Sequence, residues 1–326
     1  MKRGALLSVI LLSICLLFPN FIEAKEDKAS LGFKGDNHQS RSFAIKSGDT
    51  YYINTGVLEN KDSGIYKLSK DLKQSRLIKK GSYSNITIYG NSFILFNEDE
   101  GLLQQLSLDG KVLKQYPEVD SNSFLIDGNL IYYNSENVFY QISTNGKENK
   151  LLFEPKGYVQ EYTINNGWLY FAYTLPVSDD PYDMDTTSHL AKVKINNPKK
   201  EDLLIKNVEN IDSIIVRDGY IYSVIHKSSD DLGRYLYRMD YSGKNLKRIS
   251  TVETSSSFIG SKYIYFVNNT FDDKETLFRM TVDGKKVKKV GTIPGRKSSF
   301  EYYDGVFYFE LQAPKQYKTT LHKISI

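Results

Sequence analysis

The chain has little of what most enzyme and metal sites are built from. It holds one cysteine, one tryptophan and four histidines in 326 residues. The cysteine, Cys15, lies in the N-terminal apolar run, so the rest of the chain forms no disulfide, thiol nucleophile or zinc–thiolate site. The histidines show no HxH or HExxH spacing, so we expect no metal site and no bound cofactor. They are His38, His189, His226 and His322.

Long apolar runs are confined to the N-terminus. A charged start, an apolar stretch and a small residue at Ala24 are typical of a secretory signal peptide over residues 1–24. An uncleaved anchor helix is the alternative, because the apolar run is close to the shortest length that spans a membrane. We expect cleavage, no transmembrane span afterwards, and a protein that is secreted or associated with the cell envelope.

Excess charge of either sign is also absent. The whole chain carries a formal charge of +4, which falls to +3 when Lys2, Arg3 and Glu23 leave with the leader. A nucleic-acid-binding domain needs a concentrated basic face, so we expect no nucleic acid partner.

Strands and tight turns fill the rest of the chain. The residue pattern from Phe124 to Leu152 predicts four strands in a row. An Asp127-Gly128 turn joins the first two, a short loop follows, and an Asn145-Gly146 turn joins the last two. Such two-residue links suit β-hairpins. The second strand, 130–133, is apolar on both faces, which indicates a strand covered on both sides. A single four-stranded sheet cannot cover both of its own faces, so neighbouring copies must cover it.

The first turn recurs six more times, each time before an aromatic strand. The markers are Gly48, Gly90, Gly128, Gly167, Gly219, Ser261 and Gly305. Their spacing of 38 to 52 residues, with four strands per unit, indicates a β-propeller. The predicted fold is all-β, a ring of seven four-stranded antiparallel blades in one domain over residues 43–326.

The last unit ends after its third strand, at 321–326. Residues 25–42 are polar, and the segment around Leu31-Gly32-Phe33 would supply the missing fourth strand and close the ring. Deleting residues 25–40 is then expected to lower the melting temperature sharply, and an unchanged melt would refute the closing strand.

The repeats resemble a known family. The matching segments are Asp127 to Asn134, Asp218 to Tyr222 and Tyr235 to Ile249. They are similar to the bacterial secreted low-density-lipoprotein-receptor-like, or YWTD-type, β-propellers, a family of unknown function. The third-strand phrase 236–240 is also similar to TolB-type propellers. The Trp-Thr-Asp ending of the receptor form is missing, and seven units replace its six, so the resemblance implies no receptor-like ligand.

Candidate binding residues lie on one face of the predicted ring. The links between second and third strands, and between blades, share this face, called here the loop face; the tight turns lie on the opposite turn face. The longest link, 174–185, belongs to the fourth unit and carries four carboxylates around one tyrosine: Asp179, Asp180, Tyr182, Asp183 and Asp185. These residue types suit a cation, a basic peptide or sugar hydroxyls, although the spacing lacks the glycine and closing glutamate of a calcium-binding hand. A solvated acidic loop is the plain alternative.

Two further loop-face candidates are His226 in the fifth unit and Tyr317 in the last link. A solvated loop histidine is the plain reading of His226. Most of the 25 tyrosines fall at repeat positions of second and third strands, so we expect them to pack between blades.

The sequence favours a non-catalytic recognition or scaffold module. It would bind a protein, peptide or cell-wall glycan of the envelope through the loop face. The alternative is a propeller enzyme of the lyase or glycosidase type, with carboxylates in the central funnel contributed by distant units. No G-x-S-x-G nucleophile elbow occurs, and no catalytic residue is predicted. Fold alone does not decide between these functions.

Overall fold

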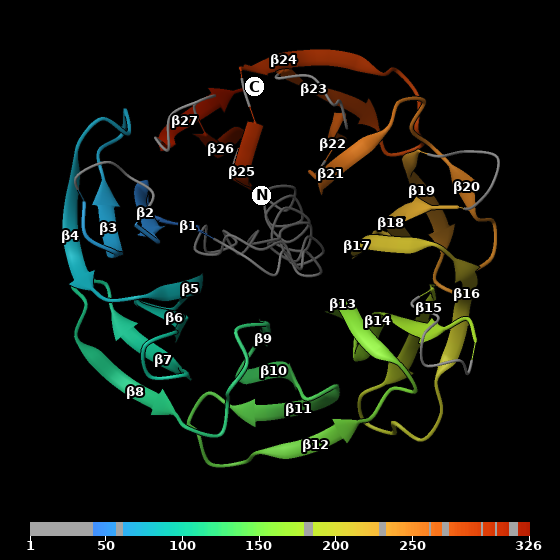
Figure 1. The fold of residues 1–326 in the computed structure, drawn as a ribbon, viewed down its shortest axis with the longest axis horizontal. Coiled ribbons are helices and arrows are strands. Elements are labelled where there is room, and N and C mark those ends of the chain that lie inside the picture. The colour runs from blue at the N-terminus through green and yellow to red at the C-terminus, as the bar shows by residue number, and fades with distance from the viewer. Residues whose placement is uncertain are drawn as a thin grey trace, which may run out of the picture.

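Seven antiparallel sheets are arranged as blades around one axis (Figure 1). The structure is a computed structural model. It describes residues 42–56, 61–178, 185–227, 233–260, 262–268, 274–294, 296–303, 305–312 and 319–326. These residues contain no helix, and hence no helix long and apolar enough to cross a membrane. The predicted all-β propeller with seven blades is confirmed.

The blades follow one another in chain order. Blade 1 is β1 (Phe43–Lys46), β2 (Asp49–Asn54), β3 (Gly64–Leu68) and β4 (Ser75–Lys80). Blade 2 is β5 (Tyr83–Tyr89), β6 (Ser92–Asn97), β7 (Leu102–Ser107) and β8 (Val112–Tyr116). Blade 3 is β9 (Phe124–Asp127), β10 (Leu130–Ser135), β11 (Val138–Ser143) and β12 (Lys150–Phe153). Blade 4 is β13 (Tyr158–Asn165), β14 (Trp168–Pro176), β15 (Thr186–Lys194) and β16 (Asp202–Val208).

The remaining blades complete the ring. Blade 5 is β17 (Asn210–Arg217), β18 (Tyr220–His226), β19 (Arg234–Asp240) and β20 (Lys247–Arg248). Blade 6 is β21 (Thr254–Ile259), β22 (Tyr263–Asn268), β23 (Lys274–Thr281) and β24 (Lys288–Pro294). Blade 7 is β25 (Arg296–Tyr303), β26 (Val306–Gln312) and β27 (Thr319–Ser325). The first strand of each blade lies nearest the axis and the fourth lies on the rim (Figure 1).

Blade 7 has three strands among the described residues. The predicted closing strand, around Leu31-Gly32-Phe33, lies outside the described residues, as do the leader and most of the polar segment 25–42. The predicted turn at Asp127-Gly128 is displaced by one residue, because Asp127 pairs with Leu130 and leaves Gly128 and Asn129 as the link.

The core is divided among the gaps between blades. Six clusters of buried apolar side chains each join two neighbouring blades. The cluster between blades 1 and 2 also takes Tyr308 from blade 7, whose ring centroid lies 5.9 Å from that of Phe43. Each blade has two apolar faces and is stable only between neighbours. Buried tyrosines such as Tyr52, Tyr133 and Tyr222 lie at repeat positions, as the sequence predicted.

The turns between third and fourth strands dock each blade onto the preceding one. A carbon added at Gly284 of blade 6 would lie 2.9 Å from Cβ of Ile249 in blade 5, and one at Gly110 would lie 2.7 Å from the carbonyl oxygen of Ile78. Both glycines also have positive φ, 82° and 89°. Glycine is therefore required at these turns for close approach as well as for backbone conformation.

Candidate functional site

Two β-bulges place polar side chains at the loop-face ends of neighbouring inner strands. The β13–β14 pairing shifts between Val159 and Glu161, so Gln160 is the extra residue. The β17–β18 pairing shifts between Ile211 and Ser213, so Asp212 is the extra residue. A bulge interrupts the alternation of a strand and re-aims side chains, which is why bulges are frequent near binding and active sites.

Asp212 is held by two donors from its own blade. Its Oδ2 lies 3.1 Å from Nη1 of Arg234, the first residue of β19, and its Oδ1 accepts a hydrogen bond of 2.5 Å from Nδ2 of Asn210. Burial raises the pKa of the Asp212 carboxyl, and the charge of Arg234 opposes that rise. The carboxyl is thus fixed in position but only partly stabilised as an anion.

Glu161 faces the same gap between blades from β13. Its Oε2 is shielded from solvent and has no hydrogen-bond partner among the described residues. Burial raises the pKa of the Glu161 carboxyl well above its ordinary value, and the nearby charge of Asp212 raises it further. Both carboxyls therefore have raised pKa values, mainly because of burial, and they belong to the inner strands of the adjacent blades 4 and 5.

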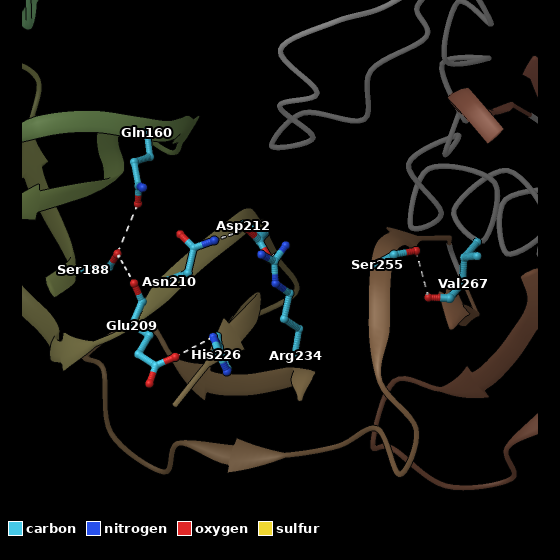
Figure 2. Close-up of polar contacts among 9 residues, drawn as sticks. All are labelled: Gln160, Ser188, Glu209, Asn210, Asp212, His226, Arg234, Ser255 and Val267. Carbon is cyan, nitrogen blue, oxygen red and sulfur yellow. Dashed lines mark hydrogen bonds and ion pairs between the residues drawn. The ribbon is translucent and has the colours of Figure 1, made fainter. Parts of the chain in front are cut away.

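A histidine–glutamate pair lies near Asp212 (Figure 2). Nδ1 of His226 lies 2.7 Å from Oε2 of Glu209, which follows β16. The Ser188 hydroxyl lies 3.2 Å from the Glu209 carbonyl oxygen and 3.2 Å from Oε1 of Gln160. These contacts and those of Asp212 bring together polar side chains of β13, β15, β17, β18 and β19, which we call the 4–5 cluster: Gln160, Ser188, Glu209, Asn210, Asp212, His226 and Arg234, with Glu161 next to Gln160 in the chain.

The equivalent bulge in blade 6 lacks a carboxyl group. There the extra residue is Ser255, whose hydroxyl donates to the carbonyl oxygen of Val267 at 3.4 Å (Figure 2). In the part of the chain that the structure describes, no group of three or more His, Cys, Asp or Glu side chains is arranged to hold a metal ion. The 4–5 cluster is therefore an acid and imidazole site without a metal-binding arrangement among these residues.

Exposed apolar side chains lie on the same face of blade 4. Tyr158, which begins β13 two residues before Gln160, is 72% exposed, and Val177, directly after β14, is 62% exposed. Isolated surface apolar residues are ordinary, but a large exposed tyrosine next to partly buried carboxylates is a combination that ligands use.

The predicted site residues are distributed as follows. Of the five candidate residues in the acidic link, Asp185 is described: it is exposed, and its carbonyl oxygen accepts a hydrogen bond of 2.9 Å from the Val177 amide. The start of that link is strand, since β14 extends to Pro176. Asp179, Asp180, Tyr182, Asp183 and Tyr317 lie outside the described residues. Their role in binding stays a prediction.

His226 differs from its expected setting. It is the last residue of β18 rather than part of the following loop, and its side chain is 20% exposed. It lies in the 4–5 cluster, paired with Glu209, because Asn210 and His226 are partners in the β17–β18 ladder.

The sequence analysis did not identify four residues of this region, because they come from different strands and blades. They are Tyr158, Glu161, Asp212 and Arg234. One signal was present: Gln160-Glu161 and Asp212 interrupt inner strands that are otherwise mostly apolar. Polar residues near the start of a first strand therefore mark candidate loop-face positions in a propeller.

No family model matches the chain, and no curated protein matches its sequence. Solved structures are similar in fold. A puromycin-hydrolyzing peptidase from Mycobacterium tuberculosis is 11% identical, with a TM-score of 0.64, over 92% of this chain and 53% of the peptidase chain. The β-propeller domain of the Trilobed protease from Pyrococcus furiosus, described as having an open velcro topology, is 14% identical, with a TM-score of 0.57, over 89% of this chain and 95% of that domain.

A propeller in a nidogen/laminin complex is 11% identical, with a TM-score of 0.47, over 71% of this chain and 89% of that chain. At these identities the likenesses show a β-propeller and nothing finer. Neither the YWTD-type nor the TolB-type resemblance has support from a family model. Likeness in fold at these identities does not select a function.

Proposed function

We propose that this chain is a non-catalytic recognition module, secreted or associated with the cell envelope, that binds a protein, peptide or glycan through the loop face at blades 4 and 5. The observation that carries the proposal is the exposed Tyr158, which begins the same strand as Gln160 of the 4–5 cluster. Tyrosine offers a rigid apolar ring with a polar tip, which suits both protein surfaces and sugar rings.

The polar contacts support binding over turnover. Both oxygens of Asp212 are engaged by Arg234 and Asn210, and Glu209 is engaged by His226. Groups held in this way are preorganised to accept a ligand, since little side-chain freedom is lost on association.

The test is an array of peptides and cell-wall glycans, probed with the chain from residue 25 onward. Tyr158→Ala is expected to weaken binding of the hits at least about tenfold, the loss typical of a central tyrosine. Leu113→Ala, which removes a 52% exposed side chain from the outer strand β8, is the matched control and is expected to bind as the wild type does. Equal binding by both variants would place the site elsewhere and contradict the proposal.

An enzyme of the glycosidase or lyase type is the second candidate. It is favoured by one observation, the pKa of Glu161, which burial and the charge of Asp212 raise, because a carboxyl with a raised pKa is suited to act as a general acid. Incubating the same glycans with the wild type and with Glu161→Gln distinguishes the two functions. Products formed by the wild type and lost in the variant would identify an enzyme, and intact glycans in both would support the module.

A further inference from the structure

We propose that the rim of blades 5, 6, 7 and 1 binds a flexible linear polyanion, one whose anionic groups are phosphodiesters or uronates. The surface is formed by the hairpins of third and fourth strands in blades 1, 5 and 6, residues 67–80, 238–248 and 279–294, together with Lys323 of blade 7. We call it the basic arc. It lies on the rim, apart from the loop face, so this inference goes beyond the proposed function and does not depend on it.

The basic arc carries a charge that the whole chain hides. Its three hairpins hold fifteen lysines and arginines and three acidic residues, a formal charge of +12. The whole chain holds 43 basic and 39 acidic residues, so everything outside these hairpins has a formal charge of −8. The equivalent hairpins of blades 2 and 3, residues 105–116 and 141–153, carry +1 each, and that of blade 4, residues 192–208, carries +3. Positive charge is therefore concentrated on the rim away from blades 2 and 3.

Bases face each other directly across the strands of each hairpin in the arc. The pairs are Lys67 and Arg76 in blade 1, Arg238 and Lys247 in blade 5, and Arg279 and Lys288 in blade 6. Like charges directly opposite each other destabilise a sheet. In blades 2 and 3 a glutamine takes the third-strand place, and in blade 4 the third-strand lysine faces an aspartate. Stability of the fold therefore does not account for the paired bases, and a bound polyanion would offset their repulsion.

Protection of open strand edges does not account for the arc either. Lysines on an outer strand discourage pairing with other chains, and the fourth strand of every complete blade is open at its outer edge. The outer strands β8 and β12 nevertheless carry one lysine each and leave Leu113 and Leu151 52% and 55% exposed. If edge protection set the distribution, these strands would need lysines more than the two-residue strand β20, which consists of Lys247 and Arg248.

Packing joins the hairpins of the arc into one surface. The turn of blade 6 docks onto the residue that follows the outer strand of blade 5. A carbon added at Gly291 of β24 would lie 3.7 Å from Cδ1 of Ile324 in blade 7, and Nζ of Lys323 donates a hydrogen bond to the Lys70 carbonyl oxygen of blade 1. In Figure 1, β20, β24 and β4 lie along the curved rim, with β27 between the last two. A linear ligand that follows this rim meets basic side chains of four successive blades.

Five lysines of the arc are exposed and make no ion pair within the described residues. They are Lys244, Lys247, Lys286, Lys288 and Lys289. A polyanion that binds such lysines releases the small counterions condensed along its own backbone, and the gain grows with the number of charges neutralised. A polymer therefore fits the arc better than a small anion does.

A flexible chain also fits better than a membrane or a nucleic acid. A curved rim touches a flat bilayer over only part of its length, whereas a flexible chain bends along it (Figure 1). Single-stranded nucleic acids are bound by aromatic rings that stack on bases. Here Arg238 and Arg279 occupy a face of the Tyr220 and Tyr263 rings, at centroid distances of 4.4 Å and 4.6 Å. Lysine binds phosphodiesters and carboxylates alike as a point charge, so the shared chemistry is a row of anionic groups, and the experiment separates its two sources.

Fluorescence anisotropy tests the inference with two labelled polymers, poly(glycerol phosphate) and a polyuronate. Each is titrated with the chain from residue 25 onward, at about 50 mM and about 200 mM salt. The arc variant combines Lys286→Gln, Lys288→Gln and Lys289→Gln, which remove three exposed charges that make no ion pair within the described residues.

The matched control combines Lys111→Gln, Lys147→Gln and Lys150→Gln. These three lysines are exposed and lie in the corresponding hairpins of blades 2 and 3. The control changes the net charge of the chain by the same amount as the arc variant, so a difference between the two variants reports the arc and not the overall charge.

The expected result is that at least one polymer binds at about 50 mM salt and binds more weakly at about 200 mM. The arc variant is expected to bind at least about tenfold more weakly than the wild type, since each lysine near an anionic surface contributes about fivefold. The control variant is expected to stay within about twofold of the wild type, because distant charges are screened. Whichever polymer binds identifies the source of the anionic groups.

No binding of either polymer, or equal weakening by the two variants, would overturn the inference. Tighter binding of phosphatidylglycerol vesicles or of single-stranded DNA than of either polymer would assign the arc to another class of partner. Self-association at low salt that the arc variant abolishes would assign it to a second copy of this chain. The loop-face array is read at about 200 mM salt, where contacts of exposed lysines are largely screened, so the recognition module is judged separately.

Discussion

Glu161 carries a carboxyl group between two blades, where an anion is poorly solvated. The carboxyl has a raised pKa because of burial and the neighbouring Asp212, so the folded protein holds its proton to higher pH than the unfolded chain does. The stability linked to this group is therefore fully present below the ordinary glutamate pKa of about 4.3 and is lost as pH rises. Such a residue weakens the fold at neutral pH, which is a known cost of binding sites.

We predict that Glu161→Gln stabilises the protein relative to the wild type at pH 8 and that the difference shrinks towards pH 4, where the wild-type carboxyl is protonated in both states. Denaturant unfolding at several pH values measures this, and taking the difference between variants cancels the other titrating groups. Glu148→Gln, at an exposed position of blade 3, should show no such trend. A difference independent of pH would mean that Glu161 is as well solvated in the folded state as in the unfolded one.

His189 is a buried base in the same blade. It is 7% exposed, its ring stacks on Tyr173 at a centroid distance of 5.2 Å, and both ring nitrogens lack partners among the described residues. Burial lowers the pKa of His189, an effect opposed by the charge of Glu201. The unfolded chain then binds a proton more readily than the folded protein, so stability falls as pH drops below about 6.5.

We predict that His189→Phe, which keeps an aromatic ring on Tyr173, gains stability relative to the wild type as pH falls from 7 to 5. Thermal melts of both proteins across that range measure the effect. Parallel melting profiles would show that His189 is protonated without cost in the folded state.

At the scale of elements, one kind of hydrogen bond recurs between successive blades. A basic side chain on the third strand of one blade donates to a backbone carbonyl of the next blade, and we call this contact the latch. Lys192 on β15 donates a hydrogen bond of 2.5 Å to the Tyr241 carbonyl of blade 5, and Arg238 on β19 donates one of 2.8 Å to the Val282 carbonyl of blade 6. Lys323 on β27 donates in the same way to the Lys70 carbonyl of blade 1. Each base lies at the same register of a third strand, and each acceptor follows the end of the next blade's third strand.

The latch base also stacks on an aromatic ring of its own blade. Arg238 lies 4.4 Å from the Tyr220 ring centroid, and Arg279 lies 4.6 Å from that of Tyr263. Arg279 faces blade 7, which has no fourth strand among the described residues, and no latch hydrogen bond joins it to that blade there. Both arginines therefore stack on a tyrosine of their own blade, but among the described residues only Arg238 also makes the latch hydrogen bond to the next blade.

We predict that Arg238→Met costs about 1–2 kcal/mol more in free energy of unfolding than Arg279→Met, the difference being the charge-assisted hydrogen bond to Val282. Chemical denaturation of the two variants measures this. Equal losses in free energy of unfolding would mean that both arginines stabilise the protein through stacking on tyrosine and that the hydrogen bond to the Val282 carbonyl contributes nothing measurable.

Much of this element structure could be predicted from the sequence, because Asp-Gly and Asn-Gly turns and apolar strands are local signals. The docking of Gly110 and Gly284 on the preceding blade could not, since the partner residues lie about 30 positions away in the chain. The bulges at Gln160 and Asp212 also escaped prediction: one extra residue in a strand changes which side chains face the ligand without changing the overall pattern of apolar residues.

At the scale of the whole molecule, the ring closes between blades 7 and 1. Tyr308 packs against Phe43, and the Glu310 carboxyl of blade 7 lies close enough to Tyr52 of blade 1 to raise its pKa further beyond the effect of burial. The latch from Lys323 adds a hydrogen bond between the same two blades. They close the described part of the ring through side chains. Seven repeats and an incomplete last blade were predictable by counting turns, whereas the contacts between the two ends of the chain were not.

We predict that Tyr308→Ala lowers the free energy of unfolding by about 3–5 kcal/mol, as for other large-to-small core changes, and raises hydrogen exchange first in blades 1 and 7. Tyr265→Ala, at the same repeat position in blade 6, is the matched control and should raise exchange first in blades 6 and 7. Exchange that rises evenly around the ring in both variants would mean that closure between blades 7 and 1 has no separate role.

The proposed binding also depends on the whole ring, because the 4–5 cluster exists only while blades 4 and 5 are held together. The most direct test of its role is a crystal structure of the chain with the tightest hit from the peptide and glycan array. The account predicts ligand density over Tyr158 at the loop-face end of blades 4 and 5. Density confined to the turn face or to the outer strands would contradict it and place recognition on another surface.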